Sequence, residues 1–257
     1  MKSVRVGLML LAVTVLSSCD KPETKYNNVP PSAAHAWTPV TFKAADDLTI
    51  FGRRYDAAKP KAVILLFHQA ESSKGEYTEI APRLRDAGYT AIAIDQRSGG
   101  KFYGDNETVA LLGKSADFLD TKPDLQAALN LAGDLKLPVI LWGSSYSSSL
   151  VFPLAVENPG KVKAILAFSP GEYFPDKALV KTAAAKVDVP VFVTSASDPK
   201  EVAEARAIAA AVPDGKAEQY VPAAAVHGSS MLIAGKDPKG TEANWGAVMA
   251  FLKKVAP

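Results

Sequence analysis

The sequence predicts an α/β protein in which a mostly parallel sheet is covered by helices on both faces. Three observations support this prediction. Short apolar runs rich in Val, Ile and Leu recur along the chain, without the alternation expected of a strand with one wet face. Amphipathic stretches of helical length separate these runs. The 257 residues, 48% of them hydrophobic, suffice for one domain with a substantial core.

The strands are expected in roughly eight places, as in doubly wound α/β proteins. The first two flank Asp46 and Asp47, a polar pair that predicts an antiparallel hairpin. The later runs are apolar throughout and bounded by polar or turn-forming residues, which indicates burial on both faces. In order, the expected strands are 40–43, 48–55, 62–67, 90–94, 139–142, 162–168, 189–194 and 217–221.

The helices are predicted from periodicity and from their ends. Gly88 follows the first as a C-cap, and Pro123 lies in the first turn of the second. The expected helices are 76–87, 123–135, 146–156, 199–211 and 242–255. Two longer irregular pieces, 96–121 and 169–187, are long enough to form a pocket wall but too short for a substantial cap domain, so we expect little or no cap.

The first residues have the layout of a secretory signal. Lys2 and Arg5 precede an apolar run over 6–16, which is about half the length that a membrane-spanning helix needs. The stretch Leu-Ser-Ser-Cys that ends at Cys19 resembles a bacterial lipobox. The resemblance implies removal of residues 1–18 and lipidation of Cys19; the alternative is an ordinary signal peptide with Cys19 incidental.

Residues 19–38 are polar, contain prolines and lack any period, so we expect a flexible tether from lipidated Cys19 to a folded domain over 39–257. This arrangement implies a lipid-anchored protein of the bacterial cell envelope that faces the periplasm or the exterior. Lys2 and Arg5 account for the excess of 29 basic over 27 acidic residues. The remaining chain is formally neutral and has no charge footprint for nucleic acid.

The strongest chemical motif is Gly143-Ser-Ser145-Tyr-Ser147, between a buried strand and a helix. It is a version of the G-x-S-x-G turn that exposes a nucleophilic serine. The flanking positions must be small because the turn is sharp, and serine at 147 still meets that need. The turn presents the hydroxyl of Ser145 and places the backbone N–H of Tyr146 at a helix start, where it can stabilise an oxyanion.

A serine nucleophile needs a base, and the chain has three histidines. His35 lies in the predicted tether, and His68 ends a central strand. His227 follows the last strand and precedes the last helix, where the base belongs when nucleophile, acid and base follow one another along the chain. His227 is therefore the predicted general base.

The acid that orients the histidine is expected after a strand between Ser145 and His227. Asp198 directly follows the strand 189–194 and is the first choice, although Asp198 followed by a proline also predicts a helix cap. Glu172 is the reserve candidate. Asp188 precedes its strand and so belongs to the opposite edge of the sheet.

These motifs together resemble the α/β-hydrolase family, nearer to its dienelactone-hydrolase-like members. The resemblance implies a three-layer fold and an oxyanion hole made by the N–H groups of Tyr146 and Ala70, with Gln69 as a second possibility because it replaces a family glycine. It also implies that His68 is structural, and that Asp95 and Arg97, in an Asp-x-Arg turn, hold loops together.

The function implied is that of a serine hydrolase, which cleaves a small carboxylic ester or lactone through an acyl-enzyme on Ser145. Neither a metal nor a cofactor is expected, because the sequence has no metal-ligand cluster and no phosphate-binding loop. Two alternatives remain: a catalytically silent binding protein of the same fold, and a serine peptidase or amidase with the same three residues. Aromatic and apolar side chains expected near the pocket are Phe102, Tyr103, Phe118, Phe152, Tyr173, Phe174 and Met231.

Overall fold

The computed structural model describes Met1 and residues 36–257. The predicted signal segment, lipidated Cys19 and nearly all of the predicted tether lie outside the described residues and stay predictions. Within the described residues, no helix is both long and apolar enough to cross a membrane.

Eight strands form one sheet in the order β1-β2-β4-β3-β5-β6-β7-β8. The hairpin β1–β2 is antiparallel, with Asp47 in a left-handed conformation at its turn, and β2 also runs antiparallel to β4. All other pairs are parallel, which confirms the predicted α/β class. The strands are β1 Thr38–Lys43, β2 Thr49–Tyr55, β3 Val63–Phe67, β4 Thr90–Ile94, β5 Val139–Ser144, β6 Ala164–Phe168, β7 Val191–Thr194 and β8 Ala217–Gln219.

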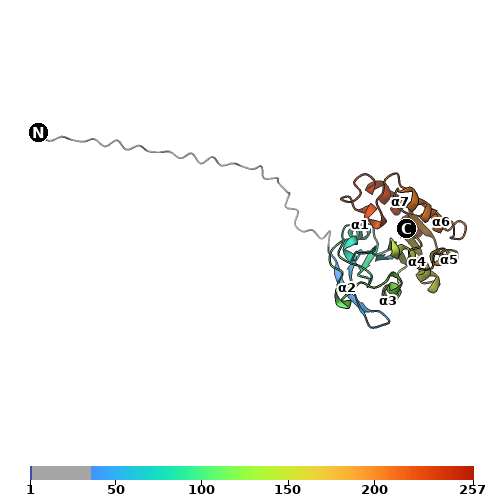
Figure 1. The fold of residues 1–257 in the computed structure, drawn as a ribbon, viewed down its shortest axis with the longest axis horizontal. Helices are drawn as coiled ribbons and strands as arrows, with labels where there is room; N and C mark the ends of the chain where they lie inside the picture. Colours follow the sequence, from blue (N-terminus) through green and yellow to red (C-terminus); the bar gives the residue numbers. More distant parts are fainter. Residues whose placement is uncertain (2–35) are drawn as a thin grey trace. The chain divides into compact units, whose positions relative to one another are not determined.

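The helices cover both faces of the sheet, as expected for three layers. Side chains of α3, α4, α5 and α6 pack with one set of core residues, and those of α1 and α7 pack with the other. Figure 1 shows α3 beside α4, and α1 beside α7. The helices are α1 Ile80–Asp86, α2 Glu107–Leu112, α3 Lys122–Gly133, α4 Tyr146–Glu157, α5 Leu179–Ala184, α6 Pro199–Ala209 and α7 Thr241–Val255.

The structure differs from the sequence prediction mainly in short helical pieces. The predicted helix 76–87 is divided into a 3-10 turn, η2 (Lys74–Tyr77), and α1. The segments expected to be irregular contain α2, α5 and another 3-10 turn, η3 (Phe118–Thr121). These pieces are too short to show a clear hydrophobic period. The described residues form no separate cap, as expected.

The position of the site follows from the strands at the centre of the sheet. β3 lies between β4 and β5, and Phe67 at its end is paired with Gly143 of β5. Because parallel strands end at the same edge, the loop after β3 and the turn after β5 meet there.

Candidate active site

The turn after β5 has the geometry of a nucleophile elbow. Ser145 adopts φ 58° and ψ −126°, a conformation that costs a residue with a side chain about 1–3 kcal/mol. Its backbone N–H donates to the carbonyl of Phe168 at the end of β6 (2.8 Å), and α4 begins at the next residue. The tertiary structure thus holds a strained serine between two buried strands and a helix.

The small residues on either side of the turn have distinct roles. A Cβ on Gly143 would lie 2.4 Å from the Cα of Ser148 and 2.5 Å from the carbonyl oxygen of Ser147, so only glycine fits. The hydroxyl of Ser147 donates to the carbonyl of Phe67 (2.7 Å) and accepts the backbone N–H of Ser144 (3.0 Å). Serine at 147 therefore ties the turn to β3, a contact that glycine cannot make.

His227 lies against the elbow. Its Nε2 is 2.8 Å from the Oγ of Ser145. The loop that carries His227 is fixed by two backbone donors: the N–H of Gly228 donates to Ser169 Oγ (3.0 Å), and that of Ser229 donates to Ser144 Oγ (2.9 Å). The predicted pair of Ser145 and His227 is thus brought together from residues 82 positions apart.

The carboxylate on the other side of the imidazole is Glu201, not Asp198. Glu201 Oε1 lies 3.0 Å from His227 Nδ1. Burial alone would raise the pKa of the Glu201 carboxyl, but the hydrogen bond and charge of His227 outweigh it, so the pKa lies below its ordinary value. The expectation that Asp198 orients His227 is wrong, and Glu201 is the residue that sequence reasoning missed.

Asp198 has the role that was its alternative, that of a helix cap. Its carboxylate caps α6 by accepting the N–H groups of Lys200 (2.9 Å) and Glu201 (3.2 Å), and its side chain is exposed. The reserve candidate Glu172 accepts the backbone N–H groups of Val180 and Lys181 at the start of α5. The position of Glu201 in the sequence could have indicated this role. It lies in the first turn of the helix after β7, and side chains there lean back toward the helix N-terminus and so toward the end of that strand.

The backbone N–H groups of the two predicted oxyanion donors remain available. Within residues 36–257, the N–H groups of Ala70 and Tyr146 donate no hydrogen bond outside regular helix and strand pairing. Tyr146 is the first residue of α4, so its N–H has no partner within the helix. The N–H of Gln69, the second possibility from the sequence, already donates to Glu76 Oε2 (2.9 Å).

The buried polar residues near the edge form links between loops. Burial lowers the pKa of His68 to about 4, so its imidazole is neutral, and it contacts the carbonyl of Gln69 and the N–H of Gln96. Asp95 pairs with Lys74 (2.5 Å), and Arg97 pairs with Asp124 (2.7 Å) and Asp46 (2.5 Å). In the described part of the chain, no group of three or more His, Cys, Asp or Glu side chains is placed to hold a metal ion.

One cavity borders the Ser145–His227 contact, and a second holds three of the aromatic side chains that were expected near the pocket. One, of about 290 Å³, is lined by His227 and by Gln69, Phe102, Tyr103, Val226, Ser230 and Lys236. The other, of about 580 Å³, contains Phe118, Tyr173 and Phe174, and the ring of Phe118 stacks on that of Tyr146 with centroids 4.3 Å apart. Five of the seven side chains expected near a pocket are therefore found there; Phe152 and Met231 are core residues that line neither cavity.

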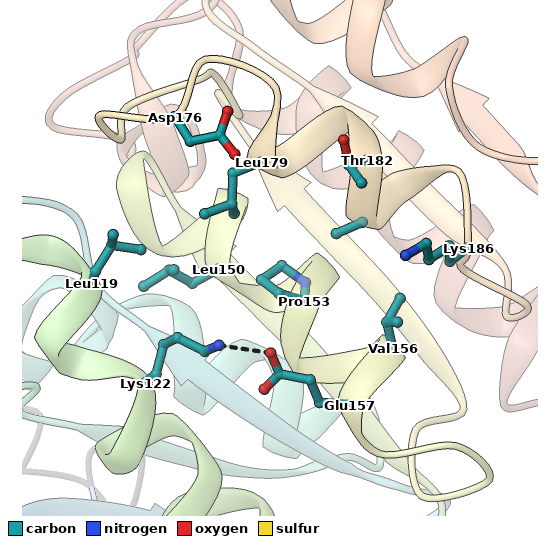
Figure 2. Close-up of a pocket in the computed structure, with 11 residues that line it drawn as sticks. Leu119, Lys122, Leu150, Pro153, Val156, Glu157, Asp176, Leu179, Thr182 and Lys186 are labelled. Carbon is teal, nitrogen blue, oxygen red and sulfur yellow. Dashed lines mark hydrogen bonds and ion pairs between the residues drawn. The ribbon is translucent and has the colours of Figure 1, made fainter.

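A further cavity lies apart from this contact. Figure 2 shows it between α4, α5 and the start of α3. Its volume is about 530 Å³. Its lining is mostly apolar, and the ion pair of Lys122 and Glu157 (2.6 Å) lies along it. None of Ser145, Glu201 and His227 lines it, so it adds nothing to the arrangement of the three residues.

Solved structures of similar fold include an esterase and a dienelactone hydrolase. An esterase from Pyrococcus furiosus has a TM-score of 0.64 and 18% identity over 89% of this chain and 95% of that chain. A dienelactone hydrolase from Anabaena variabilis has 0.68 and 16% over 86% and 99%. The ferulic-acid-bound Est1E from Butyrivibrio proteoclasticus has 0.66 and 13% over 84% and 98%. At these identities the likeness shows the α/β-hydrolase fold.

Residues 58–207 match the serine aminopeptidase S33 family, so the chain belongs to that family and is a hydrolase. The matched range includes the elbow and Glu201 and ends before His227. No curated protein matches the chain in sequence.

Proposed function

We propose that the protein is a serine hydrolase that cleaves a carboxylic ester through an acyl-enzyme on Ser145. The observation that carries the proposal is the continuous chain Ser145 Oγ–His227–Glu201, with part-buried contacts of 2.8 and 3.0 Å. Ester and lactone are the same chemistry at this site, because a lactone is a cyclic ester.

This geometry supports the following reaction. Ser145 Oγ attacks the carbonyl carbon while its proton passes to His227 Nε2, and Glu201 stabilises the resulting imidazolium. The N–H groups of Tyr146 and Ala70 bind the oxyanion. The imidazolium then gives its proton to the leaving alcohol. Water attacks the acyl-enzyme by the same route and releases the acid and free Ser145.

A fluorophosphonate probe tests the nucleophile directly. We expect the folded wild-type protein to be labelled on Ser145, and the Ser145→Ala variant to be neither labelled nor active on p-nitrophenyl esters. Labelling that persists in Ser145→Ala would refute the assignment. A folded wild type that takes no label and hydrolyses no ester of the series would favour the silent binding protein.

Amide hydrolysis is the second candidate, and the family match favours it, because the family is described as serine aminopeptidases. The same three residues serve both reactions, and in amide cleavage His227 must protonate an amine. Parallel assays with p-nitrophenyl acetate and with aminoacyl p-nitroanilides separate the two. Turnover of the anilides at a rate comparable to the esters would make the peptidase assignment the better one.

The cavity beside His227 predicts a preference for an anionic group on the substrate. Lys236 Nζ lies 5.1 Å from the ring centroid of Phe102 and 5.4 Å from that of Tyr103, so the ammonium is held at the cavity. We expect Lys236→Gln to reduce the preference for a p-nitrophenyl succinate monoester over the neutral 4-methylpentanoate by roughly tenfold, through loss of a charge-assisted contact.

The matched control for this prediction is Lys239→Gln, which removes an exposed lysine outside the cavity lining. The ratio of kcat/KM for the two esters should be unchanged in the control. An equal ratio in wild type and Lys236→Gln would show that Lys236 does not select the acyl group.

We also propose that Cys19 carries the lipid that attaches the domain to the cell envelope. The proposal is supported by the apolar run directly before Cys19 and by the polar stretch after it. Mass spectrometry of the mature N-terminus is the test. An acylated Cys19 as first residue is expected, and an unmodified N-terminus elsewhere would refute it.

A further inference from the structure

Glu76 is a buried carboxylate that the reaction above does not use. It lies in η2, its side chain is fully buried, and its Oε1 has no hydrogen-bond partner among the described residues. Burial raises the pKa of this carboxyl to about 7, against the hydrogen bonds that it accepts. An ionisable group kept in such surroundings is costly to the fold, which calls for an explanation.

The contacts of Glu76 lead to the loop after β3. Its Oε2 accepts the backbone N–H of Gln69 (2.9 Å) and the hydroxyl of Ser72 (3.3 Å). The next residue, Tyr77, donates its hydroxyl to the carbonyl of Phe67 (2.6 Å). η2 therefore holds this loop at both the start and the end of the segment 67–72.

Two further backbone groups of the loop are also hydrogen-bonded. The N–H of His68 donates to Gln96 Oε1 (2.8 Å), and the carbonyl of Gln69 contacts His68 Nδ1 (2.8 Å). Among the described residues, the N–H of Ala70, which follows Gln69 directly, donates no such hydrogen bond. The Glu76 contact thus fixes the peptide group directly before the N–H of Ala70.

We propose that Glu76 is a positioning residue for the oxyanion hole: by accepting the N–H of Gln69, its carboxyl oxygen orients the loop so that the N–H of Ala70 is presented to the oxyanion. This inference rests on the proposed function. Loss of the contact lets the Ala70 N–H move, and errors of about 1 Å in such groups cost on the order of 100-fold in rate.

Three substitutions test the role. Glu76→Asp shortens the side chain by one methylene and breaks the reach to Gln69, and Glu76→Ala removes the acceptor. For both we expect kcat for p-nitrophenyl acetate to fall about 10- to 100-fold with KM within about twofold, because the oxyanion forms only in the transition state. Glu76→Gln keeps an acceptor oxygen and should restore kcat to within about threefold of wild type.

If Glu76 had a merely structural role, its substitution would not selectively lower the affinity for a transition-state analogue. We therefore expect the affinity for phenylboronic acid, which forms a tetrahedral adduct, to fall in Glu76→Asp by the same factor as kcat. Glu79→Gln is the matched control, since Glu79 is exposed, three residues away and caps nothing with its side chain. It should change neither quantity.

Stability gives an independent readout. The titratable groups that face Glu76 are His227, Tyr77 and Tyr103. Because folding raises the pKa of Glu76 from 4.5 to about 7, the protonated form is favoured in the folded state, and wild-type stability should fall as pH rises through this window. Glu76→Gln should lack this fall while remaining active.

The outcomes are distinct. If wild type hydrolyses the ester and Glu76→Asp matches it in kcat and in boronic acid affinity, the positioning role is wrong and the proposed function stands. If Glu76→Ala does not fold, the comparison of Asp with Gln decides, and a Gln variant as impaired as the Asp variant refutes the role. If wild type is inert, both proposals fall.

Discussion

Replacing Glu201 by alanine will lower kcat for ester hydrolysis by about 10³- to 10⁴-fold, whereas Asp198→Ala will leave it within a few-fold of wild type. The reason is the 3.0 Å contact of Glu201 with His227 Nδ1, which fixes the tautomer and stabilises the imidazolium. Steady-state kinetics on a p-nitrophenyl ester measure both values.

For stability we expect the opposite order, with the larger loss in Asp198→Ala. Asp198 caps α6, so Asp198→Ala is expected to cost about 1 kcal/mol of unfolding free energy. Glu204→Ala, on the exposed side of the same helix, controls for loss of charge. A larger loss of kcat in Asp198→Ala than in Glu201→Ala would restore Asp198 as the orienting acid and contradict the geometry.

Substituting Gly143 by alanine will destabilise the protein by about 3 kcal/mol or more, a large effect for one methyl group. The added Cβ would overlap the backbone of Ser147 and Ser148 in the first turn of α4, where no flexible side chain can move aside. Relief requires displacement of the elbow, so activity should fall with stability. Denaturant unfolding and ester hydrolysis measure the two effects.

Gly246 offers the matched control. It lies inside α7, and a Cβ there would meet no atom within 4 Å. Gly246→Ala should therefore raise stability by about 0.5–1 kcal/mol, because alanine loses less backbone freedom than glycine in a helix. If Gly143→Ala is as stable and active as wild type, the close approach at the elbow does not constrain position 143.

Much of the fold was predictable because its signals are local. The apolar runs that became β3, β4 and β5 cannot face water on either side, and the elbow motif needs only a strand, a small residue and a helix in succession. The division of the expected helix 76–87 was not predictable in this way. η2 depends on the contacts that Glu76 and Tyr77 make with the loop after β3. These contacts form only once the sheet has formed.

Residue order alone was enough to predict the α/β fold class and to propose Ser145 and His227 as catalytic residues, since each lies in a recognisable place relative to a strand. The folded arrangement was needed to identify the carboxylate that contacts His227 and the N–H groups that have no acceptor within residues 36–257. Asp198 and Glu201 are three residues apart, and the direction of the first turn of α6 separates a helix cap from a partner of the imidazole. Such choices depend on side-chain directions within about one helical turn, which residue type and order do not specify.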